Sequence, residues 1–154
     1  MQQLKIKAIP GYQYYYADTD GNIYSVTPEK PQEFFDLAKL QIAQTSPGIY
    51  FNEKTGNIKI KKLKPQLNST GYLRVVISLD GARKREFVHR LILITFKGEF
   101  PKGKETNHID GNPKNNKLSN LEFVTRSENM LHALNLERRN KKYDYTKTQP
   151  GDPF

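Results

Sequence analysis

Histidine and asparagine residues gather in one polar segment of this 154-residue chain. The segment spans residues 106–133 and has the sequence TNHIDGNPKNNKLSNLEFVTRSENMLHA. It contains six asparagines and two of the three histidines, His108 and His132. An imidazole can accept a proton near neutral pH, and an amide oxygen can coordinate a hard cation. These residue types are therefore compatible with metal-assisted proton-transfer chemistry.

The same segment can also be explained without chemistry. Asp110-Gly111-Asn112 is an ordinary turn sequence, because Asp and Asn side chains hydrogen-bond to their own backbone. A polar loop of this length, however, is costly to order unless something binds to it. Composition alone leaves both interpretations open, and we expect Asp110 and Asn116 to shape the loop.

Local signals predict the elements on either side of this loop. Residues 106–109 and 122–124 are expected to pair as two strands. Thr125 and Glu128 have the spacing of a capping box, which predicts a helix over residues 126–136. The sequence therefore predicts a strand, a loop, a second strand and a helix.

This arrangement predicts where the polar side chains lie. We expect His108 to face the helix, with Asn129 in its first turn and His132 three residues further along the same face. A metal ion between strand and helix would meet the side chain of Asn107 or of its neighbour, together with that of Asn129.

The residues before the loop predict a buried scaffold. Residues 71–79 are rich in β-branched and aromatic side chains and predict a strand, which Asp80-Gly81 turns into residues 85–88. Residues 89–96 are apolar enough to form a short buried helix. We expect His89, at the start of this helix, to be a structural histidine of the core.

Composition excludes several classes of protein. The chain carries 25 Lys and Arg against 16 Asp and Glu, a net charge of +9 with a pI near 9.6, so a polyanion is the expected partner. It has no cysteine, which excludes disulfides and cysteine-ligated zinc. It has no apolar run long enough for a membrane helix. We therefore expect a soluble, intracellular protein.

Three motifs follow one another between residues 71 and 133: GYLRVVISLDG, VHRLILITF and NHIDGNPKNNKLSNLEFVTRSENMLHA. In their order and spacing they resemble the HNH nucleases with the ββα-metal motif, and among them the homing endonucleases of phages and introns. Residues 47–65 are similar to the small N-terminal module that commonly precedes this nuclease domain. Residues 10–26 look like a degenerate copy of that module, although two hairpins that reuse one turn chemistry would give the same echo.

The resemblance implies an α+β fold in which small β-hairpin N-terminal modules precede a ββα-metal HNH nuclease domain. The expected parts are a first β-hairpin module (1–30), a helical connector (31–45), a second β-hairpin module that binds DNA (46–68), the HNH nuclease domain (69–136) and a basic, flexible tail (137–154). The helical connector is expected because apolar residues recur at helical spacing over residues 32–44.

The resemblance also assigns roles to individual residues. His108 matches the histidine that acts as general base, and Asn120 matches the asparagine that orients its imidazole. Asn107 and Asn129 match metal ligands, although the family often has Asp at the position of Asn107. His132 is a further candidate for a phosphate or metal contact.

The implied activity is metal-dependent hydrolysis of phosphodiester bonds in double-stranded DNA, with Mg²⁺ or Mn²⁺ as the ion. A single site implies nicking by a monomer, in the cytoplasm of a bacterial host, with no small-molecule substrate and no membrane partner. An alternative is a nucleic-acid-binding module whose nuclease site is impaired.

Basic residues on two predicted hairpins and at the start of the buried helix are candidate DNA contacts: Lys54, Lys59, Lys61, Lys62, Lys64, Arg83, Lys84, Arg85 and Arg90.

Overall fold

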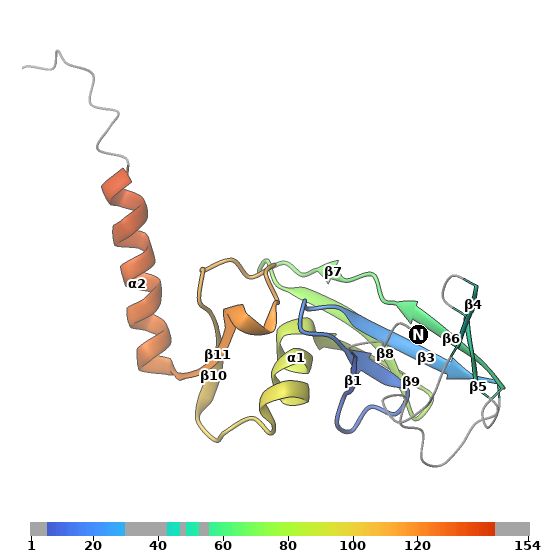
Figure 1. Cartoon of the computed structure of the whole chain (residues 1–154). Helices are drawn as coiled ribbons and strands as arrows, with labels where there is room; N and C mark the ends of the chain where they lie inside the picture. The colour runs from blue at the N-terminus through green and yellow to red at the C-terminus, as the bar shows by residue number, and fades with distance from the viewer. Residues whose placement is uncertain (1–5, 30–42, 47–48, 53–55, 144–154) are drawn as a thin grey trace, which may run out of the picture.

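The computed structural model describes residues 6–29, 43–46, 49–52 and 56–143. Figure 1 shows a mixed architecture in which β-sheets surround a short helix, α1, and a long helix, α2, extends away from the rest of the chain. The predicted α+β fold class is confirmed. No helix in the described part of the chain is long and apolar enough to cross a bilayer.

The N-terminal strands form one antiparallel sheet of six strands in the order β1-β2-β3-β6-β5-β4. The two predicted hairpins are part of this sheet, β2–β3 in the first and β5–β6 in the second, and they join because β3 pairs directly with β6. The strands are β1 (Lys7–Ala8), β2 (Tyr15–Ala17), β3 (Ile23–Pro28), β4 (Ala43–Ser46), β5 (Ile49–Asn52) and β6 (Gly56–Lys62).

The predicted helical connector is wrong at its C-terminal end. Residues 43–46 form strand β4, because pairing with β5 satisfies the backbone groups of this segment. The rest of the connector falls on residues 30–42, which lie outside the described residues.

A second sheet carries the predicted strand pair and leads into the first helix. It contains β7 (Gln66–Leu67), β8 (Leu73–Leu79) and β9 (Ala82–Phe87). Asp80 and Gly81 both have positive φ, at 51° and 78°, as a two-residue hairpin turn requires. The helix α1 (Val88–Lys97) follows β9 directly, which confirms the predicted short buried helix.

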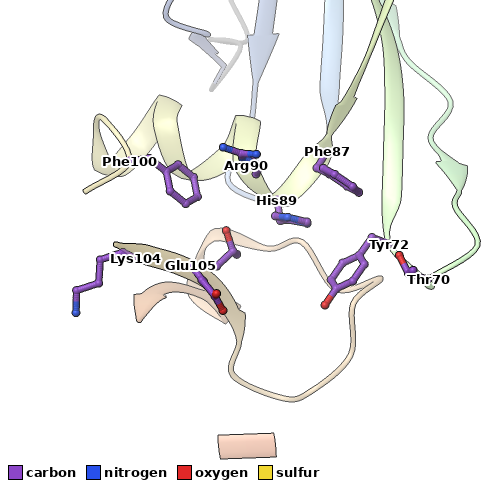
Figure 2. A pocket seen from close by; sticks show the side chains of 9 residues that line it. Thr70, Tyr72, Phe87, His89, Arg90, Phe100, Lys104 and Glu105 are labelled. Atoms are coloured by element: carbon purple, nitrogen blue, oxygen red, sulfur yellow. The ribbon is translucent and has the colours of Figure 1, made fainter. Parts of the chain in front are cut away.

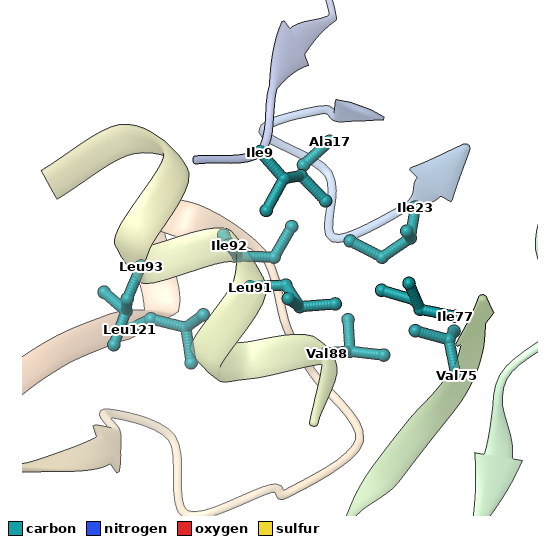
Figure 3. Close-up of a cluster of buried hydrophobic side chains, with 10 residues drawn as sticks. All are labelled: Ile9, Ala17, Ile23, Val75, Ile77, Val88, Leu91, Ile92, Leu93 and Leu121. Atoms are coloured by element: carbon teal, nitrogen blue, oxygen red, sulfur yellow. The ribbon is translucent and has the colours of Figure 1, made fainter. Parts of the chain in front are cut away.

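Helix α1 is the centre of the main hydrophobic core. Figure 3 shows its buried side chains between the N-terminal sheet, β8 and the start of β11. The fully enclosed cluster is Ile9, Ala17, Ile23, Val75, Ile77, Val88, Leu91, Ile92, Leu93 and Leu121. Helix α1 packs against the N-terminal sheet, β8 and β11, so the N-terminal strands and the C-terminal unit share a single core.

The C-terminal unit has the predicted order of elements. Strands β10 (Lys104–His108) and β11 (Leu121–Thr125) pair antiparallel, and a short 3₁₀ turn, η2 (Leu118–Asn120), precedes β11. Helix α2 (Arg126–Tyr143) follows without a break. Its first part confirms the predicted helix, but residues 137–143, predicted as tail, continue it. Residues 144–154 lie outside the described residues.

The predicted capping box starts α2. The Thr125 backbone N–H and hydroxyl both donate to Glu128 Oε2, at 2.6 and 2.9 Å, and the Glu128 backbone N–H donates to Thr125 Oγ1 at 3.2 Å. The bond from the Thr125 backbone is the main reason that the pKa of Glu128 is lowered. These bonds satisfy amide groups that the first turn of a helix otherwise leaves without partners.

His89 is buried at the start of α1, with 8% of its surface exposed. Its ring stacks on Phe87 at 5.2 Å between centroids, and its Nδ1 has no hydrogen-bond partner among the described residues. Burial, with smaller contributions from His108 and Arg90, lowers the pKa of His89 to about 4. His89 is therefore a neutral histidine at neutral pH.

We expect Thr125→Ala to lower the free energy of unfolding by about 1 kcal/mol, because it removes the hydroxyl that caps α2. Thr125→Ser keeps that oxygen and should retain most of the stability. Urea denaturation followed by circular dichroism measures both variants. An unchanged unfolding midpoint for Thr125→Ala would contradict the cap.

The low pKa of His89 predicts a pH-dependent stability. Below pH 6.5 the unfolded chain binds a proton at His89 that the folded chain excludes, so stability should fall as the pH drops from about 6.5 to 4, by up to about 3 kcal/mol. His89→Phe removes this titration. Denaturation across this pH range should therefore give a flatter dependence for the variant, and parallel curves would refute the assignment.

Candidate active site

The register of β10 and β11 separates the two residues at the centre of the predicted site. His108 pairs with Leu121, and Asn107 pairs with Glu122. Because side chains alternate along a strand, Asn107 and Glu122 lie on one face of this two-stranded sheet and His108 on the other. Leu121 belongs to the core around α1, so the face of His108 is the one that packs toward α1.

The prediction that His108 faces the C-terminal helix is therefore wrong. Its ring lies beside Tyr72, which precedes β8, and His89 of α1, at centroid distances of 5.9 and 5.3 Å. Only 6% of its surface is exposed. The sequence pattern of the loop could not show this, because the ring's neighbours come from elements earlier in the chain.

The hydrogen-bond partner of the imidazole is Asn116. Its Oδ1 lies 2.9 Å from His108 Nε2, and the side chain of Asn116 is buried. Asn116 was expected only to shape the loop, so this contact adds a residue to the predicted site. No motif in the sequence distinguished Asn116 from its neighbour Asn115.

Asn120 organises the loop and does not bond to the ring. Its amide Nδ2 donates to Asp110 Oδ1 at 2.9 Å and to the backbone oxygen of Asn115 at 2.8 Å, while its Oδ1 accepts from the Asp110 backbone N–H. Its backbone oxygen accepts from the N–H of Ile109. The structure thus differs from the expected direct contact between Asn120 and His108.

Asp110 is the second organiser of the loop, as predicted. Its carboxylate accepts from Asn115 Nδ2, from Asn120 Nδ2 and from the Asn112 backbone. These bonds, the one from Asn115 first, lower the pKa of Asp110. The carboxylate of Asp110 therefore serves to hold the loop in shape.

Of the predicted metal ligands, Asn107 lies on the face of the sheet opposite His108, and Asn129 of α2 contacts Glu105 of the same strand. Asn107 Nδ2 donates to Glu122 Oε1 at 2.8 Å, and Asn129 Nδ2 donates to Glu105 Oε2 at 3.1 Å. Each amide is thus oriented by a carboxylate, and its Oδ1 accepts no hydrogen bond from the described residues. Glu105 and Glu122 were not predicted from the sequence.

This donor set fits a hard divalent cation. Amide oxygens are suitable ligands for Mg²⁺ or Mn²⁺, and outer carboxylates commonly orient such ligands. Within the described residues no three His, Asp or Glu side chains converge into a metal cluster. Any ion here would therefore depend on the oxygens of Asn107 and Asn129, completed by water or phosphate.

His132 contacts the residue that follows the candidate base. Its Nε2 lies 3.0 Å from the backbone oxygen of Ile109. This contact ties α2 to the end of β10. The phosphate or metal contact expected of His132 stays a prediction.

A cavity of about 370 Å³ lies next to the aromatic cluster around His108. Figure 2 shows His89, Phe87 and Tyr72 along one part of its wall and Arg90 and Phe100 along another. The remaining lining residues are Thr70, Lys104, Glu105 and Thr106. His89, predicted as a core histidine, is buried and also lines this cavity.

Several predicted DNA contacts lie on exposed strand faces. In β9, Arg83 and Arg85 pair with Ser78 and Val76 of β8, so they point away from the buried Val75 and Ile77 of that strand. Arg74 of β8 lies on the same outward face and was missed from the sequence. Lys84 lies on the opposite face, since it pairs with Ile77.

The other predicted basic contacts lie on β6, in the connection between β6 and β7, and on α1. Lys59 and Lys61 are exposed on β6, on the face opposite the buried Ile58. Arg90 places its guanidinium 5.0 Å from the ring centre of Phe100, at the wall of the cavity. Lys62 and Lys64 are exposed, and Lys54 lies outside the described residues.

The family comparison matches the part of the chain that holds this site. A model of the HNH endonuclease family matches residues 86–131, from the end of β9 to the first turns of α2. The match includes Asn107, His108, Asn120 and Asn129.

Relatives match over a larger part of the chain. YosQ of the SPbeta prophage in Bacillus subtilis (strain 168), named as an HNH homing endonuclease, is 53% identical over 88 residues, which are 54% of this chain and 51% of YosQ. The DNA endonuclease I-HmuI of Bacillus phage SP01 is 36% identical over 94 residues, 61% of this chain and 51% of I-HmuI. The chain spans between 20% and 51% of the length of the curated relatives that it matches.

The fold also has a counterpart among solved structures. A structure of DNA binding and cleavage by the HNH homing endonuclease I-HmuI is similar with a TM-score of 0.58, over 95% of this chain and 69% of the I-HmuI chain. The two chains are 24% identical in that comparison, so the similarity is evidence for the fold alone. HNH nucleases generally use divalent metal ions. The resemblance predicted from the motifs is confirmed: the chain carries the sequence pattern of the HNH endonuclease family on a fold similar to that of I-HmuI.

Proposed function

We propose that this protein is a metal-dependent endonuclease that hydrolyses phosphodiester bonds in double-stranded DNA. The observation that carries the proposal is the geometry of β10. The strand ends in Asn107 and His108, which present an oriented amide and an imidazole to opposite sides of one short sheet. This pair supplies a ligand and a base within two consecutive residues.

His108 is the general base of the proposed reaction. Its ring is anchored through Nε2 by Asn116, and the adjacent His89 is neutral at neutral pH. A neutral imidazole held in one orientation can take a proton from the water that attacks the scissile phosphate. The anchoring bond fixes the direction in which that proton is accepted.

Asn107 and Asn129 are the residues that would hold the ion, either Mg²⁺ or Mn²⁺. When bound, the ion would stabilise the negative charge that develops on the phosphate and on the leaving 3′ oxygen. Glu122 and Glu105 orient the two amides and add negative charge close to them. This charge offsets the neutrality of the amide at position 107.

The basic strand faces support DNA as the substrate. Arg74, Arg83 and Arg85 lie on one outward face of β8 and β9, and the same face continues to Phe87, which lines the cavity beside His89. Arginine contacts to phosphates give affinity that does not depend on base sequence. We infer that a DNA backbone follows this face toward His108.

A DNA-binding module with an impaired nuclease site is the second candidate. The neutral side chain of Asn107 favours it, because an amide gives a cation less affinity than a carboxylate does. The two candidates differ in whether bound DNA is cut. A single site acting as a monomer would nick one strand.

We expect the purified protein to convert supercoiled plasmid into nicked circles with Mg²⁺ or Mn²⁺, and to do so no longer in EDTA. His108→Ala should abolish nicking, because it removes the base. His108→Gln keeps a polar side chain at this buried position and should be equally inactive. Agarose gels resolve the products, and thermal melts show whether the variants fold.

The controls separate the two candidate functions. Glu137→Ala changes an exposed residue of α2 that has no part in the proposed site, so this variant should fold and still nick. Plasmid binding without cutting in every metal would establish the impaired module and refute the endonuclease. Residual nicking by both folded His108 variants would refute the assigned base.

Asn107→Asp should increase the stabilisation that Mn²⁺ gives to the protein. Without metal, the new carboxylate faces Glu122 at hydrogen-bond distance and should lower the melting temperature by repulsion. With metal, the added ligand charge should tighten binding and produce a larger rise in melting temperature than in the parent. Asn112→Asp is the matched control, because it adds the same charge in the loop. An equal or smaller rise for Asn107→Asp would refute the ligand assignment.

A further inference from the structure

We propose that Asn116 is the positioning residue of His108, and that the turn of the N-terminal β2–β3 hairpin holds Asn116 in place. The inference rests on the proposed function for its catalytic meaning. It assigns a role in catalysis to a part of the chain that lies outside the family match at residues 86–131.

The first step concerns the direction of the hydrogen bond. Asn116 Oδ1 can only accept, so His108 Nε2 carries the hydrogen in their 2.9 Å contact. The lone pair of the neutral ring is then on Nδ1. Asn116 therefore selects both the tautomer of His108 and the nitrogen that accepts a proton.

The second step concerns what else Asn116 does. Its side chain is buried, with 4% of its surface exposed, and its Nδ2 has no partner among the described residues. Leaving a buried donor unpaired is costly. The contact with the ring of His108 is thus the side-chain hydrogen bond that Asn116 makes among the described residues, whereas Asn120 and Asp110 organise the loop.

The third step connects Asn116 to the N-terminal hairpin. Gly21, in the turn between β2 and β3, lies so close to the loop that a Cβ there would be 2.7 Å from the Asn116 backbone oxygen. Two residues earlier in the turn, the backbone oxygen of Thr19 accepts a hydrogen bond of 2.9 Å from the N–H of Leu118. The turn therefore contacts the loop on both sides of Lys117.

The turn itself is firmly held. The Asp18 carboxylate accepts hydrogen bonds from the Asp20 backbone, from both the backbone and the side chain of Asn22, and from the Tyr24 hydroxyl, at 2.8 to 3.0 Å. Burial and this carboxylate raise the pKa of Tyr24 to about 12. The hairpin thus presents Gly21 and Thr19 to the loop as a preformed surface.

The first experiment tests Asn116 directly. Asn116→Leu removes the acceptor, so kcat for nicking should fall about 10-fold or more while KM for DNA stays near that of the parent. Asn116→Asp restores an oxygen at this position and should recover activity relative to Asn116→Leu. Loss of kcat with recovery by Asp supports positioning, whereas unchanged kcat in folded Asn116→Leu overturns it.

A spectroscopic measurement tests the same step without activity. Long-range ¹H–¹⁵N correlation spectra, recorded above the ordinary titration range of imidazole, distinguish the two neutral tautomers of His108. The parent should show hydrogen on Nε2, and Asn116→Leu should show a mixture. Hydrogen on Nδ1 in the parent would overturn the proposal. If the parent does not nick DNA, the proposed function fails but this measurement still decides the role of Asn116.

The second experiment tests the hairpin. Gly21→Ala brings a methyl group against the Asn116 backbone and should lower kcat and disturb the His108 tautomer. Gly11→Ala is the matched control, since Gly11 has a similar positive φ, 78° against 88°, but open space around it. Both variants bear the same kind of backbone strain, so only the contact differs. Equal nicking by the two folded variants would overturn the role of the hairpin.

Discussion

The pairing register of β10 with β11 is the constraint on which the site depends. It places His108 opposite Leu121 and Asn107 opposite Glu122, and a shift by one residue would exchange the two faces. The core around α1 fixes this register, because Leu121 is buried there beside Leu93. Hydrophobic packing on one side of the sheet thus determines which polar group is available on each side.

The sequence predicted the features that depend on local signals. The capping box of Thr125 and Glu128 predicted the first residue of α2, and a run rich in β-branched and aromatic residues predicted β8, because both signals lie within a few residues of their effect. The end of α2 was missed because residues 137–143 lack an apolar face, although their Glu, Arg and Lys residues favour a helix. The 43–46 segment was missed because its strand depends on pairing with β5.

The environment of His108 could not be predicted in the same way. Its neighbours Tyr72, His89 and Asn116 lie 36, 19 and 8 residues from it in the sequence, and only the folded core brings the first two together. The family resemblance assigned the orientation of His108 to Asn120. In the structure, however, the Asn120 side chain hydrogen-bonds within the loop, to Asp110. The assignment of Asn107 and Asn129 as metal ligands stays a prediction, and the carboxylates that hydrogen-bond to their amides, Glu122 and Glu105, carried no motif.

The arrangement of charge around His108 follows from the same core. Burial lowers the pKa of the adjacent His89 to about 4, so this neighbour of His108 is neutral at neutral pH. The carboxylates of Glu105 and Glu122 are on the opposite face of the sheet, beside the amides. The two-stranded sheet therefore carries the imidazole of His108 and its aromatic neighbours on one face, and the amide of Asn107 with its carboxylate partner Glu122 on the other. Because Asn107 and His108 are consecutive residues of β10, the backbone of one strand fixes the position of the amide relative to that of the imidazole.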